Sequence, residues 1–190
     1  MIYKLRYDRF NYLLFEISPN EIEARLGDMF ILDKSETWSE FWQPVNVEFE
    51  DGSAKENIAA VPDISLLLTN QIICNQKAYD ALREALNPYG EWLPITVEGI
   101  PYWLLHVTKK TGVEYVDVKN SKRTLYVVDY NEIEKLTFKN ELLESLLLFK
   151  TAYNDYKNIY CTDKFKNLIM EFGLKGLLFS TELGDADNYK

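Results

Sequence analysis

The chain has a single histidine, His106, and only two cysteines, Cys74 and Cys161, in 190 residues. One histidine excludes a metal site built on several histidines, and it leaves a serine or cysteine triad with only one candidate base. Two cysteines are too few for a disulfide framework, and they lack the spacing of metal-ligand pairs. We therefore expect both cysteines to be buried free thiols.

The sequence also lacks the common catalytic and phosphate-binding motifs. It contains no glycine-rich phosphate loop, no G-x-S-x-G and no H-E-x-x-H. Carboxylate pairs occur at Glu48 with Glu50 and at Glu132 with Glu134, a spacing that suits one face of a strand. Such pairs are common in acidic proteins, so we expect no catalytic residue, no cofactor and no bound metal. An enzyme with a carboxylate or His106 site stays open as an alternative.

Long apolar runs are absent as well. No run approaches the ~18 residues that cross a bilayer, and residues 1–15 alternate charges with aromatic side chains instead of forming the apolar segment of a signal peptide. These features predict a cytoplasmic protein that does not associate with membranes. Because 47% of the residues are hydrophobic and 14% are aromatic, the chain has ample material for its own core.

The charge is strongly negative and unevenly distributed. A net charge of −9 argues against a nucleic-acid partner, because phosphate binding requires clustered lysine and arginine. Residues 1–63 hold 13 acidic and six basic side chains, whereas the rest of the chain holds 17 and 15. The acidity therefore belongs to the N-terminal third.

Three aromatic residues lie in a turn-like segment within this acidic part, and an alternating strand follows them. Aromatic residues rimmed by charge are typical of protein interfaces, where the aromatics carry affinity and the acids set the association rate. The predicted partner-binding residues are Trp38, Phe41, Trp42, Glu48, Glu50 and Asp51. The alternative is that the aromatics plug a sheet from outside and the acids form a solvated face.

Two segments have the pattern of a short strand that leads directly into a helix. Residues 72–74 precede a helix predicted at 75–86, which Asn75 caps and whose apolar residues recur at helical spacing. Near the C-terminus, Thr162 caps a helix predicted at 163–172, and Gly173 ends it. Both helices should bury one face, with Leu82 and Leu168 in the core. Asp63, which follows a proline just before the first unit, is expected to serve a capping or turn role.

The remaining elements are mostly strands. Ser18 and Pro19 predict a short helix, residues 91–97 and 102–108 predict strands, and residues 113–118 would continue an antiparallel meander. The leucine-rich stretch suits either a helix at 141–147 or a buried strand at 146–149. We predict an α+β fold in which a largely antiparallel sheet packs helices against one face. Residues 1–61 would form an acidic, aromatic-rich lobe and residues 62–190 the core, in one continuous domain overall.

Several of these segments together resemble a known family. They are Pro62-Asp63-Ile64, the helix at 75–86, the sequence GEWLP at 90–94, and residues 159–165 and 173–179. This pattern is similar to a large bacterial family, first defined as a domain of unknown function and later assigned to the immunity proteins of polymorphic toxin systems. The similarity covers roughly residues 62–183. The family more often has serine where Asn75 and Thr162 stand, a difference that preserves the capping role.

The resemblance implies a cytoplasmic, non-enzymatic protein that binds and neutralises a cognate secreted toxin. It transfers no binding residue, because partner surfaces differ between members of such families. An acidic surface would be steered toward the basic cleft of a toxin that attacks nucleic acids or nucleotides. A regulatory interaction module with a different partner is the alternative.

Overall fold

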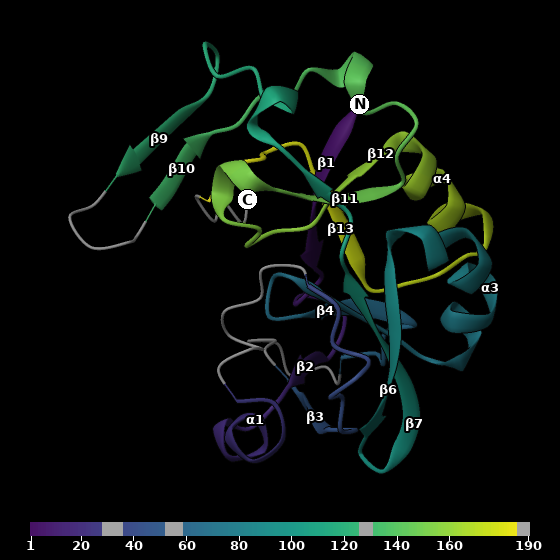
Figure 1. The fold of residues 1–190 in the computed structure, drawn as a ribbon. Helices are drawn as coiled ribbons and strands as arrows, with labels where there is room; N and C mark the ends of the chain where they lie inside the picture. Colours follow the sequence, from purple (N-terminus) through teal and green to yellow (C-terminus); the bar gives the residue numbers. More distant parts are fainter. Residues whose placement is uncertain (28–35, 52–58, 126–130, 186–190) are drawn as a thin grey trace.

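The computed structural model describes residues 1–27, 36–51, 59–125 and 131–185. The protein has an α+β fold, as the sequence predicts, in which a closed six-stranded barrel lies beside a five-stranded sheet (Figure 1). Around the barrel the strand order is β2, β3, β6, β7, β5, β4. These strands are β2 (Leu14–Glu16), β3 (Asn46–Glu50), β4 (Ile64–Leu67), β5 (Gln71–Cys74), β6 (Gly90–Val97) and β7 (Ile100–Val107).

The five-stranded sheet has the order β13, β1, β12, β11, β8. Its strands are β1 (Ile2–Tyr7), β8 (Lys110–Thr111), β11 (Leu148–Thr151), β12 (Tyr160–Thr162) and β13 (Leu177–Ser180). The N-terminal strand β1 pairs antiparallel with both β12 and β13. Since β1 belongs to this sheet and β2 and β3 belong to the barrel, the boundary at residue 61 does not separate two hydrogen-bonded units.

A two-stranded hairpin of β9 (Lys122–Leu125) and β10 (Asn131–Lys135) projects from the body of the protein (Figure 1). The strand predicted at residues 113–118 is wrong. Residues Val113–Tyr115 form a 3-10 turn, and only Val116 pairs with another strand-like residue, through a bridge to Phe138. Val116 is buried, whereas Val113 and Val118 are exposed, so burial does not alternate along this segment as it does along a half-buried strand. The leucine-rich segment, for which the sequence left helix and strand open, leads into strand β11 at Leu148–Thr151.

The helices begin where their capping residues predict. They are α1 (Pro19–Arg25), α3 (Gln76–Leu86) and α4 (Asp163–Glu171). The side chains of Ser18, Asn75 and Thr162 each accept a hydrogen bond from a backbone N–H of the first turn. These bonds satisfy donors that the helix itself cannot pair. Short 3-10 turns occur at Asn87–Tyr89, Asn140–Leu142 and Ala152–Asn154.

The main hydrophobic core lies between the barrel and the five-stranded sheet. Helix α3 contributes Ala78, Leu82 and Leu86 to it, all fully buried, and α4 contributes Phe165 and Ile169. Leu168, predicted to be a core residue, packs at its margin and is only half-buried. A second core fills the barrel, and a third covers the opposite face of the sheet.

Asp63 joins the two strand–helix units. Its backbone N–H donates to the Lys175 carbonyl at 2.9 Å, and its carbonyl accepts from the Asn75 N–H at 2.9 Å. Its carboxylate accepts from Asn75 Nδ2 at 3.0 Å, Lys77 Nζ at 3.0 Å and the Lys175 N–H at 3.1 Å. Burial acts to raise the pKa of this carboxyl, but the three hydrogen bonds and the lysine charge together hold the pKa below its ordinary value. Asp63 thus has a structural role, but it links Asn75, Lys77 and Lys175 instead of serving as the expected helix cap or turn residue.

The packing of α3 predicts the cost of a cavity in the main core. Leu82→Ala should lower the free energy of unfolding by about 2–5 kcal/mol, because the fully buried side chain is removed and its surroundings collapse only in part. Urea denaturation followed by circular dichroism measures this. The control is Glu84→Ala on the exposed face of α3, which should stay within about 0.5 kcal/mol of wild type. Equal losses in the two variants would contradict the assigned helix face.

The lowered pKa of Asp63 predicts a pH-dependent stability. A carboxyl whose pKa is depressed on folding contributes stability above its unfolded pKa, about 3.9, and this stability is lost as the pH falls through the folded pKa. Asp63→Asn should therefore cost about 1–2 kcal/mol at pH 7 and progressively less below about pH 4. Denaturation curves at several pH values test this. A cost that is constant with pH, or one shared by the exposed control Asp80→Asn, would refute the role of the charge.

Candidate functional site

The predicted aromatic segment runs along the barrel, and its first aromatic residue enters the core. Trp38 is only 5% exposed and belongs to the core inside the barrel. Its ring stacks on His106 with the ring centroids 3.6 Å apart. The Glu91 carboxylate accepts hydrogen bonds from the backbone N–H groups of Trp38 and Ser39 and so holds the segment in place. Trp38 is therefore a core residue and not part of an exposed binding surface.

The other two aromatic residues lie progressively further out. Trp42 is half-buried, stacks parallel to Trp38 at 6.0 Å and donates from Nε1 to the Pro94 carbonyl at 2.9 Å. Pro94 precedes Thr96 and Val97, the β6 residues that pair with β3. The Trp42 indole therefore packs beside a part of β6 that has no β3 partner. Phe41 is 57% exposed. Only Phe41 and the outer edge of Trp42 remain accessible to a partner.

The predicted acidic residues lie at the other end of β3. Glu48 and Glu50 alternate with inward-facing residues, so both point out from the barrel wall, and both are exposed, as is Asp51. A strand rises about 3.3 Å per residue, so β3 alone places about 13 Å between its first residue and Glu50. The predicted site therefore divides into two, with the aromatic segment before β3 and the carboxylates along its outer face.

The register of β2 and β3 adds a further carboxylate to this outer face. Glu16 on β2 is the direct cross-strand partner of Glu48, and Leu14 is the partner of Glu50. Like charges directly opposite each other on a sheet are destabilising. Among the described residues, no cationic side chain forms an ion pair with any of these three glutamates. We call Glu16, Glu48 and Glu50 the acidic face.

An open pocket of about 380 Å³ lies beside the acidic face. Glu16 and Glu50 both line it, together with Tyr7 and Thr69. The rest of its lining is apolar and consists of Leu14, Phe15, Ile17 and residues 66–68. The pocket thus combines an apolar floor with two carboxylates.

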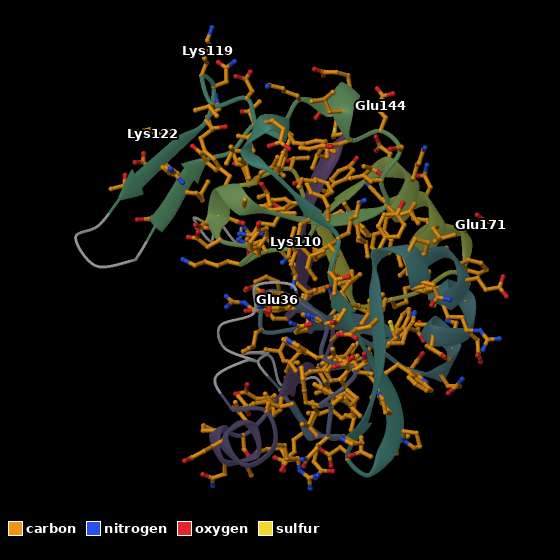
Figure 2. The ribbon with its side chains drawn as sticks, in the orientation of Figure 1. Glu36, Lys110, Lys119, Lys122, Glu144 and Glu171 are labelled. Atoms are coloured by element: carbon orange, nitrogen blue, oxygen red, sulfur yellow. The ribbon has the colours of Figure 1, made fainter. Side chains whose placement is uncertain are left out.

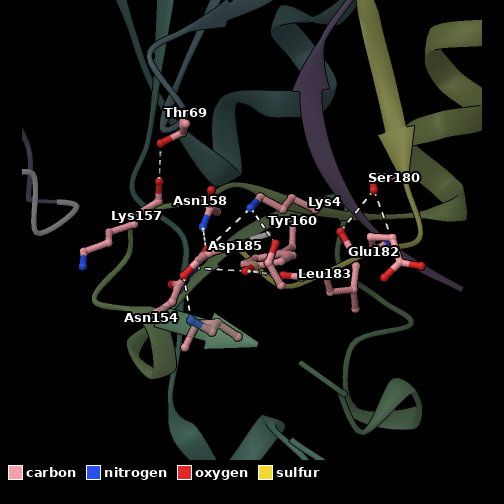
Figure 3. A network of polar contacts seen from close by, with 12 residues as sticks. Lys4, Thr69, Asn154, Lys157, Asn158, Tyr160, Ser180, Glu182, Leu183 and Asp185 are labelled. Carbon is pink, nitrogen blue, oxygen red and sulfur yellow. Dashed lines mark hydrogen bonds and ion pairs between the residues drawn. The ribbon is translucent and has the colours of Figure 1, made fainter. Parts of the chain in front are cut away.

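Leu68 on the edge of this pocket has an unusual backbone. Its φ is +56°, a left-handed conformation that a non-glycine residue adopts at a cost of about 1–2 kcal/mol. Its side chain is nevertheless large, apolar and 51% exposed. The turn is held from its other side by the Thr69 hydroxyl, which donates to the Lys157 carbonyl at 2.8 Å (Figure 3). Strained residues that the surrounding structure holds in place are often found at functional sites.

His106 is fully buried on the wall of β7. Its Nε2 lies 2.7 Å from the Glu36 carbonyl oxygen and donates to it, and its Nδ1 lies 3.1 Å from the side-chain amide of Gln71. With both ring nitrogens engaged and one ring face stacked on Trp38, the imidazole is inaccessible to a substrate. The arrangement is that of a structural histidine.

The two thiols are buried, and the second carboxylate pair lies on the β9–β10 hairpin. Cys74 and Cys161 are both free and buried, as predicted, and burial raises the pKa of each thiol far above its usual range. A nucleophilic cysteine requires the opposite shift. Glu134 lies on the hairpin, where the hydrogen bond from Lys122 is the main cause of its lowered pKa. Glu132 and Glu134 lie on the two-stranded hairpin, and not on the barrel that carries the acidic face.

A network of largely buried polar contacts fixes the C-terminal end of the described chain (Figure 3). Lys4 Nζ donates to the Gly184 carbonyl at 2.9 Å and lies 3.6 Å from Asp185 Oδ1, which also accepts from Asn158 Nδ2 at 3.2 Å. Burial, and then the Asp185 charge, raise the pKa of Tyr160 far above its usual range, so its hydroxyl stays protonated. These contacts anchor residues 183–185 against β1 and β12.

In the described part of the chain, no group of three or more histidine, cysteine, aspartate or glutamate side chains is arranged to hold a metal ion. None of the described helices has the length and apolar character needed to span a membrane. No protein-family model matches the chain, and no curated protein matches its sequence significantly.

Sequence reasoning did not identify the pocket or two of its residues, Glu16 and Leu68. The pairing of Glu16 with Glu48 depends on strand register, which joins residues 32 positions apart and leaves no local pattern. Leu68 had a weak signal, because Thr69 and Asn70 form a polar interruption between two apolar runs. That interruption marks the turn between β4 and β5.

The different burial of the three aromatic residues predicts different effects on stability. Trp38→Ala should lower the free energy of unfolding by about 3–5 kcal/mol, because it empties a stacked position in the barrel core. Phe41→Ala, at an exposed position, should change it by less than about 0.5 kcal/mol. Urea melts of the two variants measure this difference. A Trp38→Ala variant with the same free energy of unfolding as wild type would contradict the burial of this side chain.

Proposed function

We propose that this protein is an immunity protein that binds a cognate bacterial toxin and neutralises it by covering it, without catalysis. The observation that carries the proposal is the acidic face, where three exposed glutamates lie on neighbouring strands with no cationic partner among the described residues. A protein that needs these carboxylates only for its own stability would pair them or separate them. A cationic partner would remove the repulsion between them.

The remaining support comes from two directions. The sequence segments described above resemble an immunity-protein family. In addition, the candidate nucleophiles and bases of an enzyme are occupied in structural roles, since His106 is buried and hydrogen-bonded and both thiols are buried. A stable scaffold with an accessible charged surface is what inhibition by occlusion requires.

Charge would speed the encounter. Lys122 lies on the projecting hairpin and Lys119 in the loop before it, both away from the barrel (Figure 2), so these lysines do not screen the carboxylates of β2 and β3. Complementary charge raises association rates above the 10⁵–10⁶ M⁻¹s⁻¹ that is typical without steering. The same interaction weakens with added salt, because the Debye length is about 10 Å at 0.1 M ionic strength.

The test is protection of bacterial cells from candidate toxin domains encoded beside this chain's gene. Induction of the toxin domain alone should stop growth, and co-expression of this protein should restore it. Purified protein should form a complex with a catalytically inactivated toxin domain in size-exclusion chromatography. Arrested growth despite soluble expression of the protein, together with separate elution of the two components, would contradict the proposal.

A further inference from the structure

The pocket beside the acidic face combines two chemical properties at one place. Its floor is built from apolar residues of β2 and β4, and its rim carries the carboxylates of Glu16 and Glu50. A lysine or arginine side chain has the matching construction, with an apolar stem and a charged end. Arginine fits best, because its planar guanidinium donates to carboxylates in a fixed geometry.

The charges of the pocket are available for an external partner. No described side chain forms an ion pair with Glu16 or Glu50, and Glu48 places a further negative charge directly opposite Glu16. A cation that entered the pocket would therefore meet the field of three carboxylates. A neutral or acidic partner would leave the repulsion among the three carboxylates unrelieved.

A strained turn lies at the same place. Leu68 holds a left-handed backbone conformation and presents an exposed apolar side chain at the pocket edge, where glycine or asparagine would be less strained. The hydrogen bond from Thr69 to the Lys157 carbonyl keeps the turn in this position. The strain is explained if Leu68 is required to contact something outside the chain.

We propose that the pocket between β2 and the β4–β5 turn is the docking site for an arginine or lysine side chain of the toxin, with its stem against Leu68 and its charge between Glu16 and Glu50. This proposal rests on the proposed function and specifies the contact that performs it. The 380 Å³ of the pocket accommodate the side chain together with part of its flanking segment.

The experiment measures the affinity of the inactivated toxin domain for three variants by isothermal titration calorimetry at 50 mM and 300 mM salt. The double variant Glu16→Lys with Glu50→Lys should lose at least tenfold in affinity at low salt and should lose most of the salt dependence. The matched control is Glu84→Lys with Glu171→Lys, which makes the same change in net charge on exposed positions of α3 and α4 and should bind nearly as wild type.

The third variant, Leu68→Gly, separates binding from folding. Glycine relieves the left-handed strain, so the variant should melt no lower than wild type. Its affinity for the toxin domain should still fall several-fold, because the apolar contact is lost. Both pocket variants should also protect cells less well than the control variant.

The outcomes distinguish this inference from the proposed function. Wild-type protection together with full affinity in both pocket variants would overturn the docking site and leave the immunity function intact. Equal losses in the pocket variant and the charge-matched control would also overturn it, because they would assign the effect to net charge. Failure of wild type to bind or protect would overturn the proposed function and this inference with it. A wild-type dimer that the pocket variants dissociate would assign the pocket to a second copy of the chain.

Discussion

The structure depends on one junction, where the Asp63 carboxylate holds together segments far apart in the sequence. It contacts the cap of α3 and the backbone that follows α4, while its own peptide groups bond to Lys175 and Asn75. Gly176 lies in the same junction with φ at +119°, and a β-carbon there would lie 2.4 Å from the Ile64 carbonyl oxygen. The close approach therefore requires glycine. It brings the barrel and the five-stranded sheet together around a common core.

This junction also determines which parts of the surface remain available. Helices α3 and α4 and the five-stranded sheet pack against the outer wall of β4, β5 and β7, where Ile64, Ile72 and Leu105 are fully buried. The outer face of β2 and β3 remains exposed, and it carries Glu16, Glu48 and Glu50. Closure of the barrel fixes these strands rigidly, so the carboxylates are presented in a defined arrangement. A rigid surface loses little conformational entropy on binding.

Charged residues occur in two different environments in this protein. In the interior, Lys4 and Asp185 lie close together and are surrounded by hydrogen-bonding partners, because an unpaired charge away from water is costly (Figure 3). On the barrel wall, like charges are placed opposite one another. Water screens that repulsion, so the cost is small. This contrast distinguishes charges that hold the fold from charges suited to recognition.

The sequence by itself determined the elements whose signals are local. The caps at Ser18, Asn75 and Thr162, the apolar stripe of α3, and the burial of both cysteines were all predicted, because each depends on residues within a few positions of one another. Only the tertiary structure decided the closure of the barrel, the place of β1 between β12 and β13, and the burial of Trp38 against His106. Those features depend on strand register and long-range pairing, which leave no periodic pattern in the chain. The pocket belongs to the second group, since its two carboxylates and its strained leucine come from two strands and a turn that only the closed barrel brings together.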